Sequence, residues 1–482
     1  MSNTKGNEER QEGAMQVRQS PAPHEPEPLN LGIVLFICCL GQFMVVLDAS
    51  IVNVALPDMR RELELSGEQL QWVINAYTVI FAGFLLVGGR LADLMSIRKV
   101  FAGGTILFGL ASLAAGLAQT PSALLIARAV QGLGGAILAP ATLTILFTSF
   151  TDQGQRMKAF GSWSAAAAGA GAVGALLGGV ITQWTSWRWV FLINVPISLI
   201  LVLGALRVVR DGARSKDGSV DIIGAILITA GLMAVVYGLV QGSSTSWNTV
   251  STLVLILGLI LCLAFVFNEG KLAKSPLVPL GIFKNPSVSA ANVISMTTSG
   301  VLIGVFYLMT LLLQYVYGTS PLMTGVAYLP MALAILLTSR WVAPYLLGKF
   351  GPRPVLITAS LLAFCGLFWL SRVTGSGSWW LQVVVPSLVF GLGQGLASAS
   401  VTTAGTTGVP YTMAGLVSGL LNASRQIGGA LLLAVLVAVA GAGLRPGGGI
   451  APHQTAFLVA SLFPIVGLIA ATAIPKKESK SH

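Results

Sequence analysis

Three charged side chains lie inside long apolar segments of this sequence: Asp48, Arg128 and Arg425. A charge in an apolar segment is costly, so each of the three is a candidate for function. A buried carboxyl group can bind and release a proton, and a nearby guanidinium can neutralise it. These residue types therefore predict an ion-coupled process in which Asp48 is the proton or cation site.

Asp48 also has a structural interpretation, in which it pairs with a neighbouring helix and only fixes the packing. Ser or Asn could make a purely structural hydrogen bond with a smaller desolvation penalty, which favours the functional interpretation. Arg128, Gln131 and Gly135 are spaced at i, i+3 and i+7, so they lie on one face of a helix. The guanidinium of Arg128 and the amide of Gln131 therefore point the same way.

The elements that must position these residues are membrane helices. The chain of 482 residues is 54% hydrophobic and only 9% charged, whereas a soluble domain is about a quarter charged. Its apolar blocks of roughly 20 residues match a hydrocarbon core of about 30 Å. The sequence therefore predicts an all-α polytopic membrane protein with fourteen spans, at approximately 31–57, 70–91, 99–118, 122–149, 159–182, 189–209, 220–240, 250–270, 287–315, 322–346, 354–372, 379–402, 413–443 and 453–473.

The net charge of +11 does not indicate nucleic-acid binding, because the basic residues form no groove-binding cluster. They are concentrated in the loops on one side of the predicted spans, as in cytoplasmic loops. We therefore expect a multi-pass protein of the cytoplasmic (inner) membrane with both termini in the cytoplasm. Residues 1–30 are polar and are predicted to be a disordered N-terminus without a cleavable signal peptide. The cysteines lie in apolar runs without metal-type spacing, and we interpret them as packing residues: Cys38, Cys39, Cys262 and Cys365.

Two sequence features recur in the second part of the chain. The stretch VQGLGGA at 130–136 returns as VFGLGQG at 389–395, and the charged loop at 87–101 returns in degenerate form at 348–356. The nearly equal offsets indicate two parallel halves with the same helix order. The offset between the repeated features exceeds the length of six helices, and the excess corresponds to two further helices. The predicted domains are 31–215, 216–285 with two extra helices, and 286–474, followed by a tail at 475–482.

The segment around Asp48, VVLDASIVNVALPDM, resembles the helix-1 signature of the fourteen-span drug:proton antiporters of the major facilitator superfamily. The stretch beginning at Arg128 resembles the helix-4 motif of the same family, and the stretch from Asn422 to Gly429 resembles its helix-13 pattern. The resemblance implies the major facilitator fold, with 6 + 2 + 6 helices and alternating access. It also places helices 1 and 4 side by side, so that Asp48 and Arg128 can interact in proton coupling. The alternative for Arg128 is a buried pair that holds the N-terminal bundle together.

The loop VGGRLADLMSIRKVF at 87–101 resembles the loop signature of the same superfamily. Ser96 replaces the second glycine of that signature, and Ile97 replaces its first basic residue. The resemblance implies a conformational latch that ties two helices together on the cytoplasmic face. The residues that match the signature are Gly89, Leu91, Ala92, Asp93, Arg98 and Lys99.

The fifth predicted span has a run of small residues that resembles the antiporter motif, although Ala175 replaces its proline. Gly174, Gly178 and Gly179 therefore predict close helix packing. The next segment also resembles the family at the outer face. We interpret Arg188 and Asn194 there as interface anchors, accompanied by an aromatic belt of Trp184, Trp187 and Trp189.

The resemblance further implies that helices 1, 4, 9 and 12 line the substrate cavity. The polar or aromatic residues that we assign to this cavity are Asn53, Gln131, Asn292, Tyr307, Gln314, Gln394, Asn422 and Arg425. Each of them has a structural alternative as a packing or interface residue, and Arg425 can instead extend its head group toward the interface.

The sequence has no P-loop and no soluble domain that could hold ATP, and it has no HExxH motif. We therefore predict no enzyme and no cofactor, with the proton gradient as the energy source. The expected function is export of a small amphipathic drug or antibiotic in exchange for protons, by a monomer in the lipid bilayer. Because no acid lies deep in the second half, a dicationic substrate is less favoured than a neutral, monocationic or anionic one. The alternatives are an exporter or facilitator of an endogenous metabolite and a non-transporting membrane sensor.

Overall fold

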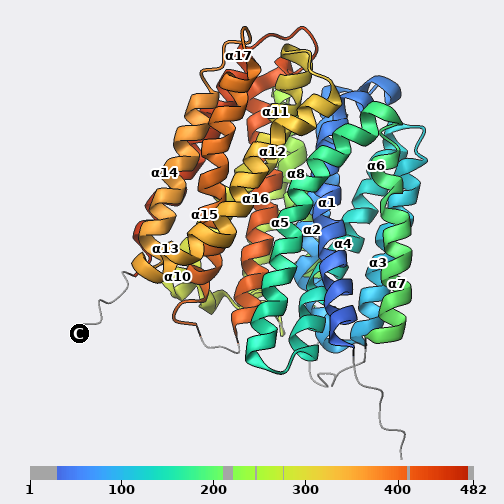
Figure 1. The fold of residues 1–482 in the computed structure, drawn as a ribbon, viewed down its shortest axis with the longest axis vertical. Coiled ribbons are helices and arrows are strands. Elements are labelled where there is room, and N and C mark those ends of the chain that lie inside the picture. The colour runs from blue at the N-terminus through green and yellow to red at the C-terminus, as the bar shows by residue number, and fades with distance from the viewer. Residues whose placement is uncertain (1–29, 210–220, 245–246, 275, 410–412, 476–482) are drawn as a thin grey trace, which may run out of the picture.

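The computed structural model describes residues 30–209, 221–244, 247–274, 276–409 and 413–475. Within these ranges the regular secondary structure is helical throughout, and fourteen helical segments are long and apolar enough to cross a membrane (Figure 1). The predicted all-α class and the predicted number of spans are confirmed. The predicted disordered segment at 1–30 and the tail at 475–482 lie almost wholly outside the described residues.

Short polar caps delimit the first helices. Ser66 and Gln69 form a reciprocal capping box at the start of the second span, so two backbone N–H groups find acceptors there. Thr120 caps the fourth span and is followed by Pro121 at its first position. The first six spans are α1 (Leu31–Leu63), α2 (Gly67–Leu94), α3 (Ile97–Gly116), α4 (Pro121–Ser149), α5 (Gln153–Trp184), and a sixth made of α6 (Trp189–Leu192) and α7 (Asn194–Val208).

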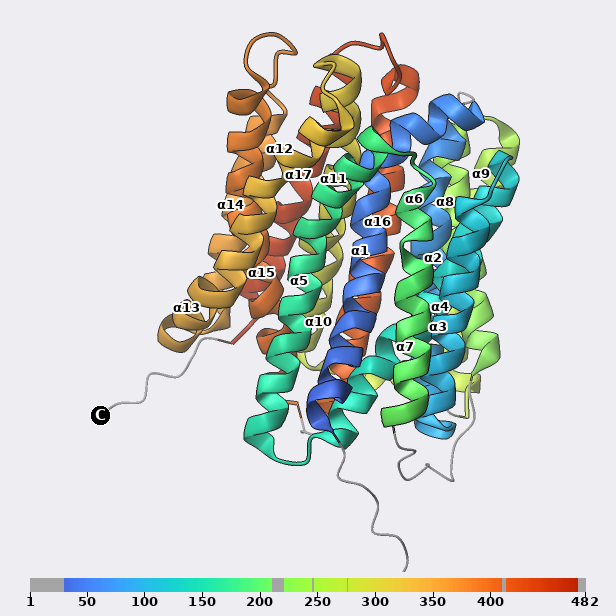
Figure 2. The same cartoon turned by 45° about the vertical axis from the view of Figure 1, so that its right-hand side comes forward.

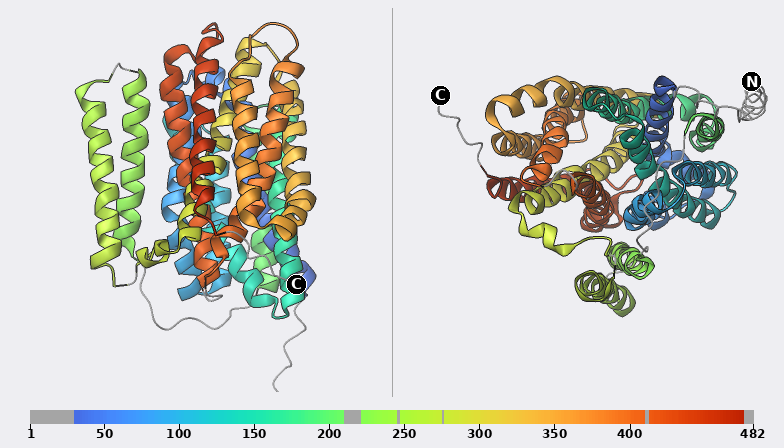
Figure 3. Two further views of the ribbon diagram at one scale, coloured as in Figure 1. Left: turned by 90° about the vertical axis from the view of Figure 1, so that its left-hand side faces the viewer. Right: turned by 90° about the horizontal axis from the view of Figure 1, so that it is seen from below.

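Spans seven and eight are α8 (Ile222–Ser244) and α9 (Thr249–Phe267), and α9 continues into a π-helical turn, η1 (Asn268–Leu272). They pack on each other as a hairpin, and α8 also contacts α2 and α16 (Ala414–Ala440). Figure 3 shows this hairpin standing beside the other helices rather than among them. The position fits the two extra helices that the repeat offset predicts, although the exact domain boundaries remain a prediction.

The predicted spans of the second half are present, and π-helical turns occur in three of them. In such turns the backbone forms i→i+5 hydrogen bonds, a pattern that hydropathy does not reveal. The ninth span is α10 (Pro286–Ile294), η3 (Ser295–Ser299), α11 (Gly300–Leu311) and η4 (Leu312–Val316). The tenth is α12 (Pro321–Leu337), η5 (Thr338–Val342) and α13 (Ala343–Phe350). The last four are α14 (Pro352–Leu370), η6 (Trp380–Val384) with α15 (Val385–Thr406), α16, and α17 (Ala451–Thr472).

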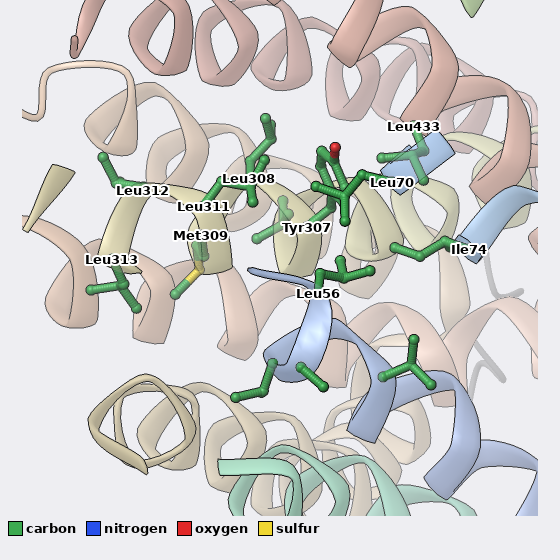
Figure 4. Packing of buried hydrophobic residues seen from close by; sticks show 14 of the residues in the cluster. Leu56, Leu70, Ile74, Tyr307, Leu308, Met309, Leu311, Leu312, Leu313 and Leu433 are labelled. Atoms are coloured by element: carbon green, nitrogen blue, oxygen red, sulfur yellow. The ribbon is translucent and has the colours of Figure 1, made fainter. Parts of the chain in front are cut away.

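The two ends of the helix bundle differ in how the halves meet. We name them the Glu64 end, which carries the turn between α1 and α2, and the opposite Leu31 end (Figure 1). An apolar cluster near the Glu64 end joins Leu56 of α1 and Leu70 of α2 to Leu311 of α11 and Leu433 of α16. Figure 4 shows these side chains converging from both halves. The burial of this cluster therefore stabilises contact between the halves at that end.

Hydrogen bonds reinforce the same contact. Gln314 Nε2 donates to the Val54 carbonyl at 3.0 Å, and Gln71 Nε2 donates to the Leu433 carbonyl at 3.4 Å. A guanidinium from the first half also lies over an aromatic ring of the second, since Arg60 Cζ is 5.9 Å from the ring centroid of Tyr315. The halves are thus closed against each other at the Glu64 end.

Candidate functional site

Asp48 and Arg128 form an ion pair in the interior of the first six helices. Arg128 Nη1 lies 2.6 Å from Asp48 Oδ2, and the arginine and the aspartate are 1% and 0% exposed. The pair joins α1 to α4, which also lie beside each other in the contact pattern of the helices. The structure therefore brings together the two charged residues that the sequence assigns to one site.

The other oxygen of Asp48 accepts two amide N–H groups. Gln131 Nε2 donates to Asp48 Oδ1 at 2.8 Å, and Asn194 Nδ2 donates to the same oxygen at 3.1 Å. Each amide uses its second hydrogen on Ser112 Oγ, at 3.1 Å from Gln131 and 3.0 Å from Asn194. Ser112 then donates to the Phe191 carbonyl at 2.9 Å. One hydroxyl on α3 thus connects α4, α6 and α7 to the carboxylate on α1.

The guanidinium of Arg128 has further partners on α2 and α4. Its Nε donates to the Val73 carbonyl at 2.9 Å, and its Nη1 also donates to Gln131 Oε1 at 2.7 Å. Its Cζ lies 4.5 Å from the ring centroid of Tyr77, which supports a cation–π contact. These contacts would hold the arginine in one orientation even without the bond to Asp48.

The network is buried away from water, so its stability depends on the charge of Asp48. A buried ion pair is stable only when its remaining donors and acceptors are satisfied, and here Asp48 accepts from three side chains. Adding a proton to Asp48 would remove the negative charge that these donors bind. The described contacts are those that fit an ionised Asp48, because all three of its side-chain partners donate to it.

The sequence interpretation of Asn194 as an interface anchor is wrong. Its side chain is fully buried and belongs to the Asp48 network, while its Oδ1 has no hydrogen-bond partner among the described residues. Trp187 is also buried rather than part of a belt at the membrane interface. Its Nε1 donates to Glu62 Oε2 at 2.7 Å. Trp184 and Trp189 are exposed as expected, and Arg188 pairs with Glu62 at 2.8 Å.

Ser112 is a member of this network that the sequence interpretation missed. A lone serine in the apolar run of α3 carries no charge, and it has no polar neighbour at i+3 or i+4 that would mark a buried face. Its role is visible only once α3, α4 and α7 are packed together. Asn194 is equally hard to read, because its aromatic neighbours suggest a membrane interface.

The predicted latch residues lie at the Leu31 end, where α2 ends and α3 begins. Arg98 is partly buried and Lys99 is exposed, whereas the side chain of Asp93 lies outside the described part of the structure. Gly89 could accept a side chain, since an added Cβ would be in ordinary contact with Pro140 Cβ at 3.8 Å. The tight contact falls on Gly88 instead, where an added Cβ would overlap the Ala136 carbonyl. The latch therefore remains a prediction.

The three glycines of α5 lie against other helices. An added Cβ on Gly174 would overlap Ser50 Oγ, and one on Gly178 would be 2.7 Å from the Ile51 carbonyl oxygen, so both glycines pack on α1. Gly179 faces the second half, because its added Cβ would be 2.6 Å from the Pro321 carbonyl oxygen. The backbone of α5 therefore approaches α1 and α12 as closely as small residues permit.

The predicted cavity residues do not gather at one place. Gln131 belongs to the Asp48 network. Asn53 donates to the Ala49 carbonyl on its own helix at 2.8 Å. The next residue, Val54, provides the carbonyl that accepts from Gln314. Tyr307 is enclosed in the apolar cluster at the Glu64 end, where it is 1% exposed.

The remaining cavity residues lie within the second half. Asn292 accepts a hydrogen bond from Ser424 at 2.7 Å, next to Asn422 and Arg425 on α16. Gln394 Nε2 donates to the Thr298 carbonyl at 2.6 Å. Arg425 is partly buried, and its Nε has no hydrogen-bond partner among the described residues.

A pocket of about 620 Å³ opens at the Glu64 end, between the last turns of α1 and the connection from η4 to α12. It combines acidic and basic side chains with the Arg60–Tyr315 contact described above. The residues that line it are Pro57, Asp58, Arg60, Arg61, Glu64, Leu65, Gln314, Tyr315, Thr319, Pro321 and Pro446. None of the residues of the Asp48 network lines this pocket.

The protein is thus a polytopic bundle of membrane-length helices whose first six spans enclose a buried ion pair, with a helix hairpin beside the other helices. The family model described as Major Facilitator Superfamily matches residues 38–433. The chain therefore belongs to the major facilitator superfamily. This membership, which the sequence signatures predict, places the protein among transporters rather than enzymes.

Among its relatives are several proteins named for drug or antibiotic export or resistance. The cephamycin export protein CmcT of Amycolatopsis lactamdurans is 39% identical over 412 residues, which cover 85% of each chain. The puromycin resistance protein pur8 of Streptomyces alboniger is 36% identical and is matched over 87% of this chain and 83% of its own. The multidrug resistance protein Stp of Mycobacterium tuberculosis (strain CDC 1551 / Oshkosh) is 32% identical, with 84% and 75% covered.

Solved structures confirm the fold. A bacterial homologue of the human lysosomal transporter Spinster, in an inward-facing and unoccupied conformation, superposes with a TM-score of 0.64 at 16% identity and covers 92% of this chain and 97% of its own. A point mutant of the nucleoside transporter NupG gives a TM-score of 0.62 at 14% identity, with 92% and 99% covered. At this identity the likeness concerns the fold alone.

Proposed function

We propose that this transporter exports an amphipathic drug or antibiotic from the cytoplasm in exchange for protons, by alternating access. The observation that carries the proton part is the buried network in which Asp48 accepts from Arg128, Gln131 and Asn194. The relatives named for export of, or resistance to, cephamycin, puromycin and other drugs support the substrate part.

In this proposal Asp48 carries the proton and Arg128 responds to its charge. When Asp48 is ionised, the guanidinium binds it and α1 and α4 are held together. When Asp48 is protonated, Arg128 keeps its bonds to the Val73 carbonyl and Gln131 but loses its counter-ion. The N-terminal helices then repack, and this charge-dependent repacking couples proton binding to the direction in which the transporter opens.

The distribution of basic residues supports an orientation with the Leu31 end in the cytoplasm. The closed Glu64 end then faces outward, and the described contacts between Gln314 and Val54 and between Gln71 and Leu433 belong to a state closed to the outside. The latch loop of Gly89, Asp93, Arg98 and Lys99 lies on the cytoplasmic side in this orientation. Its proposed role is to stabilise the opposite state, in which the cytoplasmic end is closed.

Drug and proton must be oppositely coupled for antiport to occur. A ligand shifts a conformational equilibrium only by its difference in affinity for the two states. Drug binding is therefore expected to favour the ionised form of Asp48. Protons that enter from outside then displace the drug outward, and deprotonation on the cytoplasmic side returns the carrier to its drug-binding state.

The proposal is tested by a drug-susceptibility panel in an efflux-deficient host. The host expresses the wild-type protein, Asp48→Asn and Asp58→Asn at matched membrane levels. Asp58 lies on the same helix, is partly buried and pairs with the exposed Arg61, so its variant controls for the loss of a carboxylate. Protection by the wild type and by Asp58→Asn, but not by Asp48→Asn, is the expected result.

The other outcomes distinguish the alternatives. Equal protection by all three proteins would keep the export function and reject Asp48 as the coupling site. Protection against no compound would favour export of an endogenous metabolite or a non-transporting role. A structural role of the Asp48–Arg128 pair would appear as loss of protein from the membrane rather than loss of protection at matched levels.

A further inference from the structure

A second pair of carboxyl groups lies outside the Asp48 network, where the α8–α9 hairpin meets the linker to the ninth span. Asp221 directly precedes α8, and Glu269 lies in η1 directly after α9. Glu269 is only 5% exposed. The mechanism proposed above uses neither residue.

The two carboxyl groups face the same point of the backbone. A Cβ added to Gly224 would lie 2.6 Å from Glu269 Oε1 and 2.7 Å from Asp221 Oδ2. Glu269 Oε1 and Asp221 Oδ2 therefore lie close to each other beside Gly224. Two carboxyl groups can form a hydrogen bond with each other only if one of them carries a proton, because an ionised carboxylate has no donor.

The remaining contacts of the pair leave one oxygen without a donor. Asp221 accepts from the Gly224 amide at 2.8 Å and from Asn268 Nδ2 at 2.6 Å. Glu269 Oε2 accepts from the Val278 amide at 2.8 Å, whereas Glu269 Oε1 is buried without a partner among the described residues. A shared proton would supply the donor that this oxygen lacks.

No cation compensates the pair within the described part of the chain. The charged side chains on neighbouring described segments are Arg90 near the end of α2, Lys271 and Lys274 beside Glu269, and Lys284 at the end of η2 (Leu280–Lys284). The described ion pairs include none that joins one of these cations to Asp221 or Glu269. Lys271, Lys274 and Lys284 are exposed, and Lys271 Nζ lies 5.4 Å from the ring centroid of Phe267.

We propose that Asp221 and Glu269 share one proton and form a second proton-binding site, separate from the Asp48 network. The proton sits on the oxygen that lacks a donor, Glu269 Oε1, and is donated to Asp221, so the pair keeps a single negative charge. Like charges in contact disfavour the doubly ionised state, which makes such a pair retain a proton.

The position of the pair gives this proton a structural consequence. The Val278 amide that binds Glu269 belongs to the linker, and Val278 packs in a cluster with Ala225 of α8, Val87 of α2 and Val417 of α16. This cluster joins the hairpin to both halves of the transporter at the Leu31 end. Loss of the proton places two like charges at the joint, so the linker is held less firmly at alkaline pH than at acidic pH.

The test uses the full-length protein, purified in detergent, in the Asp48→Asn background so that the Asp48 network does not contribute. The infrared carbonyl band of protonated carboxyl groups is compared between this protein and the same protein with Glu269→Gln or with Asp221→Asn. We expect part of the band to be present at neutral pH and to be lost in both variants. In Glu269→Gln the amide replaces the shared proton as donor to Asp221, so the melting temperature should also lose its decline from acidic to alkaline pH.

An unchanged band in both variants, together with an unchanged pH slope of the melting temperature, would overturn the proposal. If Glu269→Gln fails to fold, Asp221→Asn alone decides the question through the same band. Addition of Mg²⁺ provides the other contrary result. A melting temperature that rises with Mg²⁺ in the parent protein but not in Glu269→Gln would identify a cation site instead of a proton site.

Discussion

Ser112 Oγ lies 3.0 Å from Asn194 Nδ2, and this bond connects α3 to α7 directly behind the carboxylate of Asp48. The serine accepts from two amides and donates once, so its hydroxyl is fully used. Ser112 thereby links the two amides that bind Asp48, and through them it connects α3, α4, α6 and α7 to the carboxylate on α1. In the proposed mechanism, protonation of Asp48 changes this whole network and not the ion pair alone.

Ser112→Ala should destabilise the protein by leaving two buried N–H groups without an acceptor. Each unsatisfied group costs about 1–3 kcal/mol. The matched control is Ser198→Ala on α7, because the hydrogen bond that Ser198 Oγ makes among the described residues is a weak one to the thioether of Met44 at 3.4 Å. Thermal unfolding of the two purified variants should show the larger loss for Ser112→Ala, and equal losses would contradict the role of Ser112 as the centre of the network.

Asp48→Asn and Arg128→Met should be strongly non-additive in stability. Removing one partner of a buried pair leaves an uncompensated charge and costs about 3–5 kcal/mol. The double variant removes both charges, so its loss should be smaller than the sum of the two single losses. Denaturation of all four proteins in one detergent measures this coupling. Additive losses would show that the charges of the pair do not stabilise each other.

The sequence predicted the parts of the site that carry charge. Asp48 and Arg128 stand out because ionised groups in apolar runs are rare, and Gln131 follows from its spacing to Arg128 on one helix face. Ser112 and Asn194 could not be found in this way, because uncharged polar residues are common in membrane helices. Their contribution depends on how α3 and α7 pack against α1, which no local pattern specifies.

Some features of the fold were likewise predictable from the sequence, and others were not. The number of spans follows from the length of the apolar blocks, and the two-halved plan follows from the repeated glycine motifs. The π-helical turns at Ser295–Ser299 and Thr338–Val342 leave no trace in hydropathy. The loop signature also draws attention to Gly89, whereas the close approach between helices occurs one residue earlier, at Gly88.

Gly88→Ala should therefore disturb the protein more than Gly89→Ala. At Gly88 the new methyl group would overlap the Ala136 carbonyl, and the backbones of α2 and α4 would have to separate. At Gly89 the nearest atom is Pro140 Cβ at 3.8 Å, an ordinary contact. Fluorescence-detected size-exclusion chromatography should show a lower folded yield for Gly88→Ala. A lower yield for Gly89→Ala instead would place the tight helix contact at the signature glycine.

Gln314→Leu should weaken the closure of the Glu64 end. It removes the bond to the Val54 carbonyl, which joins the halves and contributes about 0.5–1.5 kcal/mol. The matched control is Gln454→Leu, since Gln454 Nε2 donates to the Val373 carbonyl at 2.7 Å within the second half. Spin labels at Thr185 and Ser378, measured by pulsed electron resonance in a cysteine-free protein, should report more of the open state only for Gln314→Leu. The same distances in both variants would mean that Gln314 does not hold the closed end.

Arg425 should determine how the transporter distinguishes substrates by charge. Arg425 follows Ser424 of the Asn292–Ser424 bond on α16, and no ion pair of the described residues includes it. A partly buried cation without a counter-ion favours an anionic or neutral ligand over a dication. Arg425→Gln should therefore lower the export rate of an anionic amphipathic dye several-fold relative to a neutral dye of similar size.

The two dyes are measured in the same vesicles at a fixed proton gradient. An equal loss for both dyes in Arg425→Gln would assign Arg425 to the packing of the second half rather than to substrate selection. The conservative variant Arg425→Lys separates these cases further, because it keeps the charge while changing the shape of the side chain. Export of the anionic dye retained in Arg425→Lys and lost in Arg425→Gln would attribute the preference to charge.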